Sequence, residues 1–251
     1  MRASVAEVKI LRAGGARLAA ILRQVATAVR PGVTTLELDS LARNLITAGG
    51  DEPAFLNYQP AGARQPFPAA LCVSVNDEVV HGLPGGRVIV EGDIVSLDLG
   101  LRHQGLFTDM AITVPVGQVD QESARLIEIT RRALLAGIGA LRAGGRLGDV
   151  GAAVAAVARV EKLGLVTALG GHGVGREVHE EPLVPNIGQA GEGERVVASE
   201  VLAIEPMLTL GGGTVRLSSD GFTYLTRDGS RSAHFEHTAV VTERGSEILT
   251  V

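Results

Sequence analysis

The sequence predicts a single α/β domain built from two similar halves, each with two helices followed by antiparallel strands. Two observations predict this. The same order of helix-like and strand-like segments occurs twice, and residues 30–38 match residues 142–150 in pattern, each at the junction of two predicted helices. Apolar residues make up 45% of the 251-residue chain, enough for a large core. We place the halves at about 1–119 and 120–251, with a site between them.

Helix-start signals mark both helices of the first half. Ser4 and Thr34 are each followed three residues later by Glu, which is the capping-box pattern. Apolar residues then recur at helical spacing. Pro31-Gly32 ends the first of these helices and Gly49-Gly50 ends the second.

The second half repeats this order after a short linker. Asp120 is the expected N-cap of a helix that runs to about Leu141, and a further helix is expected over about 147–162. Residues 51–70 are different because they hold four prolines and little periodicity. We expect them to form a long ordered loop, a kind of segment that often binds ligands or closes a site.

Composition excludes several classes of protein. The net charge is −5 and the basic residues are dispersed, which argues against a nucleic-acid-binding surface. Cys72 is the only cysteine, so the chain has no internal disulfide and fits a reducing compartment. No apolar run is long enough for a membrane span. We therefore expect a soluble cytoplasmic protein, and the lack of a coiled-coil pattern favours a monomer.

Five acidic or imidazole side chains in the strand-like segments predict a metal site. Asp98, Glu205 and Glu236 lie in apolar segments, where a carboxylate is costly unless it is paired or binds a metal. Asp109 and His172 lie in similar surroundings. Any one of them alone could be an ordinary edge-strand residue. Together they would form a dinuclear site for ions such as Mn, Fe, Co or Zn, which points to hydrolysis.

Asp98 and Asp109 belong to a predicted hairpin. A two-residue turn at His103-Gln104 would place the two aspartates directly opposite each other, about 4.5–5.5 Å apart at Cβ. Carboxylates that close repel unless a proton or a cation lies between them. In this hairpin His103 is expected to be a solvated turn residue.

A second motif surrounds His172. Residues 170–175 contain four glycines, which would let backbone approach an ion or a substrate closely. His179 follows seven residues later, directly before Glu180-Glu181-Pro182. A single histidine in a glycine-rich turn is weak evidence, whereas this pair of histidines is more specific.

Six segments together resemble a known family, and they occur in the family's order across most of the chain. They are residues 76–84 (NDEVVHGLP), 92–98 (GDIVSLD), 108–109 (TD), 171–182 (GHGVGREVHEEP), 204–207 (IEPM) and 235–238 (FEHT). The resemblance is to the type I bacterial methionine aminopeptidases. It implies the pita-bread fold, in which two pseudo-symmetric halves form a curved central sheet around two divalent metal ions.

The resemblance also implies roles for the candidate residues. Asp98 and Asp109 would hold one ion, and Asp109, His172, Glu205 and Glu236 the other, so that Asp109 and Glu236 bridge the pair. A water activated by the two ions would attack the peptide bond. Glu205 would move a proton from that water, His179 would stabilise the oxyanion, and His81 would contact the peptide near the leaving nitrogen.

The same resemblance implies a pocket for the methionine side chain. The matching positions are Phe55, Tyr58, Phe67, Cys72, Val178 and Phe222. Phe222 stands where many relatives have Trp, Val178 where many have Phe and Phe55 where some have Cys, so the total bulk is roughly exchanged. Cys72 is expected to be a small buried apolar residue. His234 and His237 are expected to flank Glu236 on the opposite face of its strand as structural residues.

Three functions compete at this point. The favoured one is removal of the initiator methionine from peptides and from nascent chains near the ribosome. The second is an Xaa-Pro peptidase of the same fold, but such enzymes are usually longer and tend to carry an Arg shortly before the last glutamate. The third is a metal-free binding protein on this fold. The presence of all five ligands together with His81 and His179 argues against the third.

Overall fold

The computed structural model describes residues 1–59 and 65–251, and this part of the chain contains four helices and 15 strands. The helices are α1 (Val5–Ala28), α2 (Thr35–Ala48), α3 (Gln121–Ala140) and α4 (Leu147–Val160). The strands of the first half are β1 (Glu52–Pro53), β2 (Leu71–Val75), β3 (Glu78–Val80), β4 (Ile94–His103) and β5 (Leu106–Pro115). The strands of the second half are β6 (Gly164–Leu165), β7 (Gly170–Gly173), β8 (Glu180–Pro185), β9 (Val201–Ile204), β10 (Met207–Thr209), β11 (Val215–Leu217), β12 (Tyr224–Thr226), β13 (Ser232–His234), β14 (Glu236–Thr242) and β15 (Gly245–Ile248).

Local side-chain chemistry starts the helices where the sequence predicts. Ser4 and Thr34 each form a complete capping box, at α1 and α2. The carboxylate of Asp120 accepts a hydrogen bond of 2.7 Å from the backbone N–H of Ser123 and caps α3. The predicted bounds of α4 extend two residues too far, because the helix ends at Val160.

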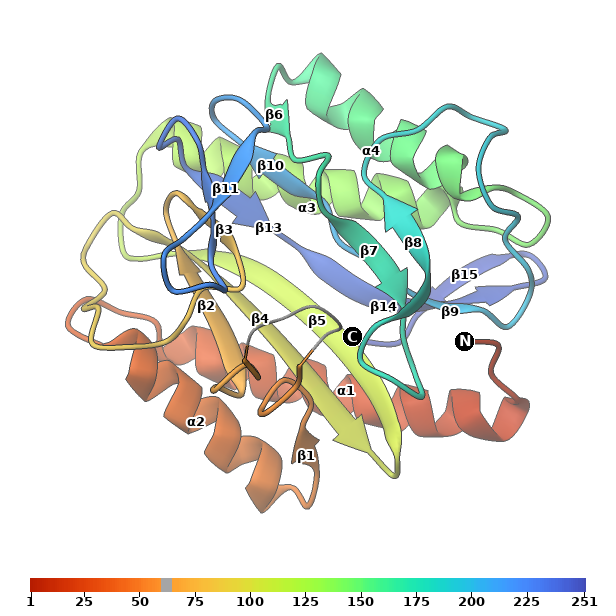
Figure 1. Cartoon of the computed structure of the whole chain (residues 1–251), viewed down its shortest axis with the longest axis horizontal. Coiled ribbons are helices and arrows are strands. Elements are labelled where there is room, and N and C mark those ends of the chain that lie inside the picture. The colour runs from red at the N-terminus through yellow and green to blue at the C-terminus, as the bar shows by residue number, and fades with distance from the viewer. Residues whose placement is uncertain (60–64) are drawn as a thin grey trace.

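All pairs of neighbouring strands are antiparallel, and most of them form one curved sheet. Its order is β1-β4-β5-β14-β9-β7-β8, with β2 beside β4 and β15 beside β14. Figure 1 shows α1 and α2 along the part of the sheet made by β4 and β5, and α3 and α4 along the other part. The predicted α/β fold with two similar halves is confirmed.

The two halves match in detail at the start of their second helix. Thr34, the N-cap of α2, forms an isolated β-bridge with Val88, and Arg146, the N-cap of α4, forms one with Arg195. These are the two positions that the alignment of residues 30–38 with 142–150 pairs. The repeat in the sequence therefore reflects a repeated contact between a helix start and a following segment.

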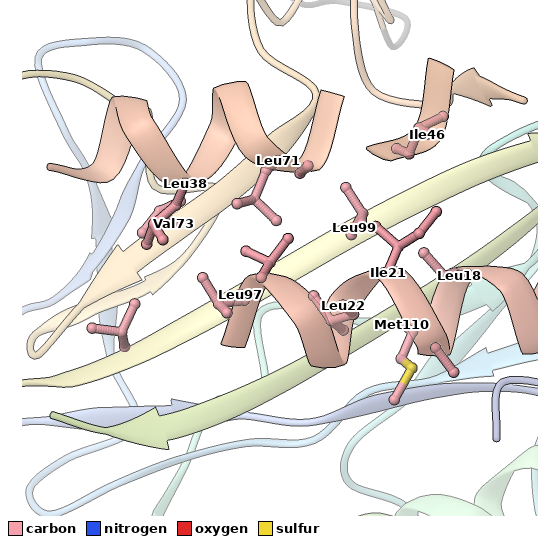
Figure 2. Packing of buried hydrophobic residues seen from close by; sticks show 14 of the residues in the cluster. Leu18, Ile21, Leu22, Leu38, Ile46, Leu71, Val73, Leu97, Leu99 and Met110 are labelled. Carbon is pink, nitrogen blue, oxygen red and sulfur yellow. The ribbon is translucent and has the colours of Figure 1, made fainter. Parts of the chain in front are cut away.

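The largest apolar core lies between the first helix pair and the sheet. Leu97 and Leu99 of β4 are fully buried there, in one cluster with Leu18 and Leu22 of α1, and Figure 2 shows these side chains directed toward one another. Because side chains alternate along a strand, Asp98 is directed to the opposite face of the sheet. The packing of the helices thus fixes the face on which the site forms.

Truncating this core should be costly. Leu99 is 0% exposed, and replacing a buried leucine by alanine removes packing and leaves a cavity at a cost of about 2–5 kcal/mol. Leu99→Ala should therefore lower the free energy of unfolding by that amount in urea titrations. Val160→Ala is the matched control because Val160 is 74% exposed. Equal losses in the two variants would contradict this description of the core.

The predicted register of the hairpin is wrong. His103 pairs with Leu106, so the turn is formed by Gln104 and Gly105, and Asp98 pairs with Ala111 while Asp109 pairs with Gly100. The physical reason is the turn, whose two central residues have φ of 47° and 87°. Such turns favour glycine as the second central residue. The aspartates remain on one face as diagonal neighbours.

The long segment 51–70 is only partly described. It begins with β1, which pairs with the end of β4, and it returns to the sheet at β2. The prediction of one ordered loop includes residues 60–64, which lie outside the described residues. None of the described helices is long and apolar enough to cross a membrane.

Candidate metal centre

The five predicted ligands lie on neighbouring elements at the middle of the large sheet. Asp98 is on β4, Asp109 on β5, Glu236 at the start of β14, His172 on β7, and Glu205 directly after β9. These strands are consecutive in the sheet order β4-β5-β14-β9-β7. Four of the side chains are buried and Glu205 is nearly so. The structure therefore brings all five together.

Their polar atoms lie within metal-ligand reach of one another. Single donor atoms of Asp109, His172 and Glu236 all lie within 4.8 Å of one another. Asp98 and Asp109 are diagonal neighbours on one face of β4 and β5, and His172 Nε2 lies 3.4 Å from Glu205 Oε1. The chain of contacts includes every predicted ligand.

The electrostatics of this cluster favour a bound cation. Burial, followed by repulsion from neighbouring carboxylates, raises the pKa of Asp98, Glu205 and Glu236 well above the usual range. Among the described residues, Asp98 Oδ1 and Glu236 Oε1 are buried without a hydrogen-bond partner. Unpaired buried carboxylate oxygens are costly, and carboxylate with imidazole is a donor set for hard or borderline divalent ions. The residues present fit a metal.

His172 is oriented as a ligand by its backbone. Its Nδ1 lies 2.9 Å from the carbonyl oxygen of Gly173, so that Nδ1–H donates and Nε2 keeps a free lone pair toward Glu205. Hydrogen bonds of this kind orient metal-binding histidines. Gly171 and Gly173 permit the close strand packing, because a Cβ at either position would lie within 2.4 Å of a backbone oxygen of a neighbouring strand.

Three further histidines surround the cluster. The rings of His81 and His179 are exposed, yet enough protein surrounds each to lower its pKa, to about 4 and about 3 respectively. The ring of His179 lies 4.2 Å from that of His172. His81 contributes to the lowered pKa of His172, His179 and His234. The structure therefore places the predicted catalytic His179 beside His172 of the metal centre, with His81 near both.

His234 does not lie where the sequence predicts. It is 1% exposed, and its Nε2 lies 3.6 Å from Glu205 Oε2, so it faces the cluster. The prediction failed because His234 and Glu236 are two residues apart, and residues two apart in an extended chain share a face. Phe235 separates the two strands, β13 and β14, to which they belong. His237 does lie on the other face, with Nδ1 2.9 Å from the hydroxyl of Thr250.

His103 also differs from its prediction as a solvated turn residue. It is the last residue of β4, and its Nδ1 lies 2.7 Å from Oδ1 of the buried Asp51. Arg17 of α1 contacts the other oxygen of Asp51 at 2.6 Å. This group joins α1, the start of the segment 51–70 and the hairpin, so it has a structural role.

An apolar cluster lies on the site face of β4. It contains all six residues predicted for the methionine pocket, namely Phe55, Tyr58, Phe67, Cys72, Val178 and Phe222. Phe67 and Phe222 meet edge to face at 5.4 Å between centroids. Gly100 makes room for this cluster, since a Cβ there would come within 2.7 Å of the Phe55 ring. Cys72 is buried, and burial raises the pKa of its thiol well above the usual range.

Sequence reasoning missed four members of this cluster, namely Ala54, Ala69, Leu83 and Phe107. Phe107 could have been found, because it shares a strand face with Asp109 two residues later on β5. Leu83 carries no such signal, since it lies outside the strands. A cavity of ≈ 420 Å³ is lined by His172, His179 and Glu180 among others, and so adjoins the metal centre.

The segment that carries Val178 and His179 is held by Glu180. One Glu180 oxygen accepts hydrogen bonds from the backbone N–H groups of Arg176 and Glu177, at 2.6 and 2.9 Å. The other lies 3.0 Å from the amino group of Met1, which is buried. The chain's first residue thus supports the segment beside the metal centre.

The buried carboxyls should make the metal-free protein less stable as the pH rises. Burial raises the pKa of Asp109 from 3.8 to about 7. The unfolded chain releases this proton near its ordinary pKa and the folded chain only near pH 7. The contribution to stability is therefore complete below about pH 4 and is lost as the pH rises through 7.

Thermal unfolding can measure this effect. Protein stripped of metal by a chelator should melt several degrees lower at about pH 8 than at about pH 6, since 1 kcal/mol corresponds to about 2–4 °C in a chain of this size. Metal-loaded protein should not show the fall, because the charges are compensated. A melting temperature of the stripped protein that stays constant or rises over this interval would contradict the prediction.

Comparison with known proteins decides the family. The sequence matches the model of metallopeptidase family M24 over residues 9–243. The chain belongs to this family. Relatives of this M24 peptidase are named methionine aminopeptidase: that of Treponema pallidum is 46% identical over 241 residues, covering 96% of this chain and 92% of the relative. Methionine aminopeptidase 1 of Mycobacterium tuberculosis is 43% identical over 255 residues, covering 99% and 94%.

Solved structures agree with the sequence relatives. The methionine aminopeptidase of Thermotoga maritima superposes on this M24 peptidase with a TM-score of 0.94 at 40% identity, covering 100% of this chain and 98% of that one. An Xaa-Pro dipeptidase from Bacillus anthracis reaches a TM-score of 0.75 at 20% identity and is covered over only 61% of its length. The second likeness shows the shared fold alone.

Proposed function

We propose that this M24 peptidase is a methionine aminopeptidase that removes the N-terminal methionine from peptides and nascent proteins. The observation that carries the proposal is the position of the five clustered ligands beside the apolar cluster, where Cys72 pairs with Asp98 across β2 and β4, together with a cavity lined by His172 and His179. The near-full-length relatives of the same name support it. We further propose that residues 1–251 act as one catalytic domain and as a monomer in the cytoplasm.

The five clustered residues would hold two divalent ions, of Co, Mn, Fe or Zn. Asp98 and Asp109 would hold one, and Asp109, His172, Glu205 and Glu236 the other. Asp109 is the diagonal neighbour of Asp98 across β4 and β5, and one of its oxygens lies within 4.8 Å of donor atoms of His172 and Glu236, which supports a bridging role. Ions bound there would lower the pKa of water and polarise the scissile carbonyl.

Glu205 would accept and return the proton during hydrolysis. Burial, followed by the neighbouring carboxylates, raises the pKa of Glu205, which favours its acceptance of a proton. The Nε2 atoms of His172 and His234 lie 3.4 and 3.6 Å from its two oxygens, so both imidazoles face the carboxyl group. A proton can therefore be held at Glu205 while the peptide bond is attacked.

His179 and His81 would bind the peptide. Both rings are neutral at physiological pH because the surrounding protein lowers their pKa, so each can donate one hydrogen bond without a charge. A neutral donor at His179 would stabilise the oxyanion that develops on the scissile carbonyl. His81 would contact the peptide near the leaving nitrogen. The free amine of a substrate's N-terminus would bind at the metal centre.

The apolar cluster would receive the methionine side chain. Phe55, Phe67 and Phe222 supply aromatic walls, and Tyr58, Cys72 and Val178 complete the set. An unbranched thioether fits apolar surroundings of this kind and interacts favourably with aromatic rings. The size of the residue that follows methionine would be limited by the cavity edge near His179 and Glu180.

Hydrolysis of two peptides distinguishes a methionine aminopeptidase from an Xaa-Pro peptidase of the same fold. Metal-loaded protein should release methionine from Met-Ala-Ser and leave an Xaa-Pro peptide intact, measured by chromatography of the products. Cleavage of Xaa-Pro without cleavage of Met-Ala-Ser would make the chain a proline-specific peptidase. Failure to cleave either peptide, together with no bound metal, would make it a binding protein.

A further inference from the structure

The hydroxyl group of Tyr58 makes a contact that lining a pocket does not require. Its oxygen lies 2.9 Å from Nδ1 of His179, and the two rings lie 5.1 Å apart with a tilt of 40°. On another side, the ring of His172 meets that of His179 edge to face at 4.2 Å. His179 is therefore held between a tyrosine and a metal-centre histidine that come from distant parts of the chain.

Backbone hydrogen bonds hold the segment that carries Tyr58. The N–H of Tyr58 donates to the carbonyl of Phe55 at 2.9 Å, and the N–H of Phe67 donates to the carbonyl of Tyr58 at 2.8 Å. Asn57, whose φ is 65°, donates to the carbonyl of Phe67 at 2.8 Å. A tight backbone arrangement thus fixes the Cα of Tyr58 and limits where its ring can lie.

The contact determines which nitrogen of His179 carries the proton. A neutral imidazole has one N–H and one acceptor nitrogen. A phenol is a good donor and a weaker acceptor than an imidazole nitrogen. Burial, followed by the charge of Glu177, raises the pKa of Tyr58 and keeps the phenol protonated. The O–H of Tyr58 therefore donates to Nδ1, and the proton of the ring resides on Nε2.

We propose that Tyr58 is a positioning residue that acts through His179. By donating to Nδ1, it holds His179 in the tautomer whose Nε2–H can donate to the scissile carbonyl. This role rests on the proposed function of His179 in hydrolysis. It assigns the hydroxyl a task separate from that of the ring, which packs beside Phe67 and Val178 in the apolar cluster.

Removal of the hydroxyl alone tests the role. Tyr58→Phe keeps the ring, so the apolar cluster and KM for Met-Ala-Ser should change little. The kcat should fall about 10- to 100-fold, the usual loss when a group that orients a functional histidine is removed. The matched control is Tyr224→Phe, which removes the chain's other tyrosine hydroxyl. Tyr224 contacts His81 through its ring, at 5.9 Å, which phenylalanine retains, so kcat should stay unchanged.

A double-mutant cycle separates this role from a general effect on structure. In a His179→Ala background, Tyr58→Phe should cost nothing further, because the group through which it acts is gone. If Tyr58→Phe lowers kcat equally in both backgrounds, or not at all in the parent that cleaves Met-Ala-Ser, the proposal is wrong. A rise in KM with unchanged kcat would likewise assign Tyr58 to the pocket alone.

A measurement of the tautomer does not depend on catalysis. Nitrogen-15 NMR of the histidine rings should show His179 protonated at Nε2 in the parent and a mixture of tautomers in Tyr58→Phe, with the signal assigned by its loss in His179→Ala. Protonation at Nδ1 in the parent would overturn the proposal. If the parent leaves Met-Ala-Ser intact but shows the Nε2 tautomer, the proposed function fails while the contact with Tyr58 stands.

Discussion

Asp109→Asn should abolish hydrolysis of Met-Ala-Ser and reduce the metal content of the protein. Asparagine has the same shape, but it lacks the charge and one acceptor oxygen that a bridging ligand supplies. Changes to groups outside the ligand set already cost about 10–100-fold in activity or metal affinity. Loss of a bridge should therefore lower kcat/KM by more than about 10³-fold. Elemental analysis after dialysis measures the metal, and a peptide assay measures the rate.

Asp39→Asn is the matched control for this substitution. Asp39 is also a buried aspartate, and its Oδ1 accepts hydrogen bonds from the backbone N–H groups of Ala70 and Leu71 at 2.8 and 3.0 Å. Asparagine can keep these bonds through its carbonyl oxygen. Metal content and kcat should remain near those of the parent. Near-normal turnover of Asp109→Asn would refute the two-ion assignment.

His179→Ala should lower kcat by about 10²–10³-fold, the loss expected when one oxyanion donor is removed. The metal content should stay that of the parent, because the five clustered ligands remain. The physical reason is that His179 contacts His172 ring to edge and bonds to Tyr58, a position from which it can reach a bound peptide. Steady-state kinetics and elemental analysis on the same sample measure both quantities.

His237→Ala provides the comparison for His179→Ala. It also removes a histidine whose pKa burial lowers to about 4, but from the face of β14 that contacts Thr250. It should reduce the thermal stability and leave kcat unchanged. If His179→Ala instead loses metal, His179 is a ligand and the five-residue assignment is incomplete.

The sequence predicts those parts of the fold that depend on neighbours along the chain. Ser4, Thr34 and Asp120 cap their helices through residues three positions away, so the pattern alone reveals them. The alternation of Leu97, Asp98 and Leu99 likewise predicts a core face and a site face. The predicted register of the hairpin is wrong by two residues, because the prediction centred the turn on His103-Gln104. The residues that adopt positive φ and form the turn are Gln104 and Gly105.

Contacts between distant segments could not be predicted in the same way. His103 meets Asp51 across 52 positions, and His179 meets Tyr58 across 121. Neither pair has a local pattern, because each depends on how the sheet brings β4 and the segment before β8 toward residues 51–59. The resemblance to a family supplied the members of the apolar cluster, and only the structure shows that the Tyr58 hydroxyl is directed to His179 rather than to a pocket alone.

Anomalous scattering can show directly whether the five side chains hold two ions. Crystals prepared under anaerobic conditions from metal-loaded protein should give two anomalous peaks enclosed by Asp98, Asp109, His172, Glu205 and Glu236. A data set collected on Asp109→Asn crystals should lack at least one of them. Fully loaded crystals that give no peak among these five side chains, or only peaks elsewhere in the molecule, would rule out the assignment of two ions to these ligands.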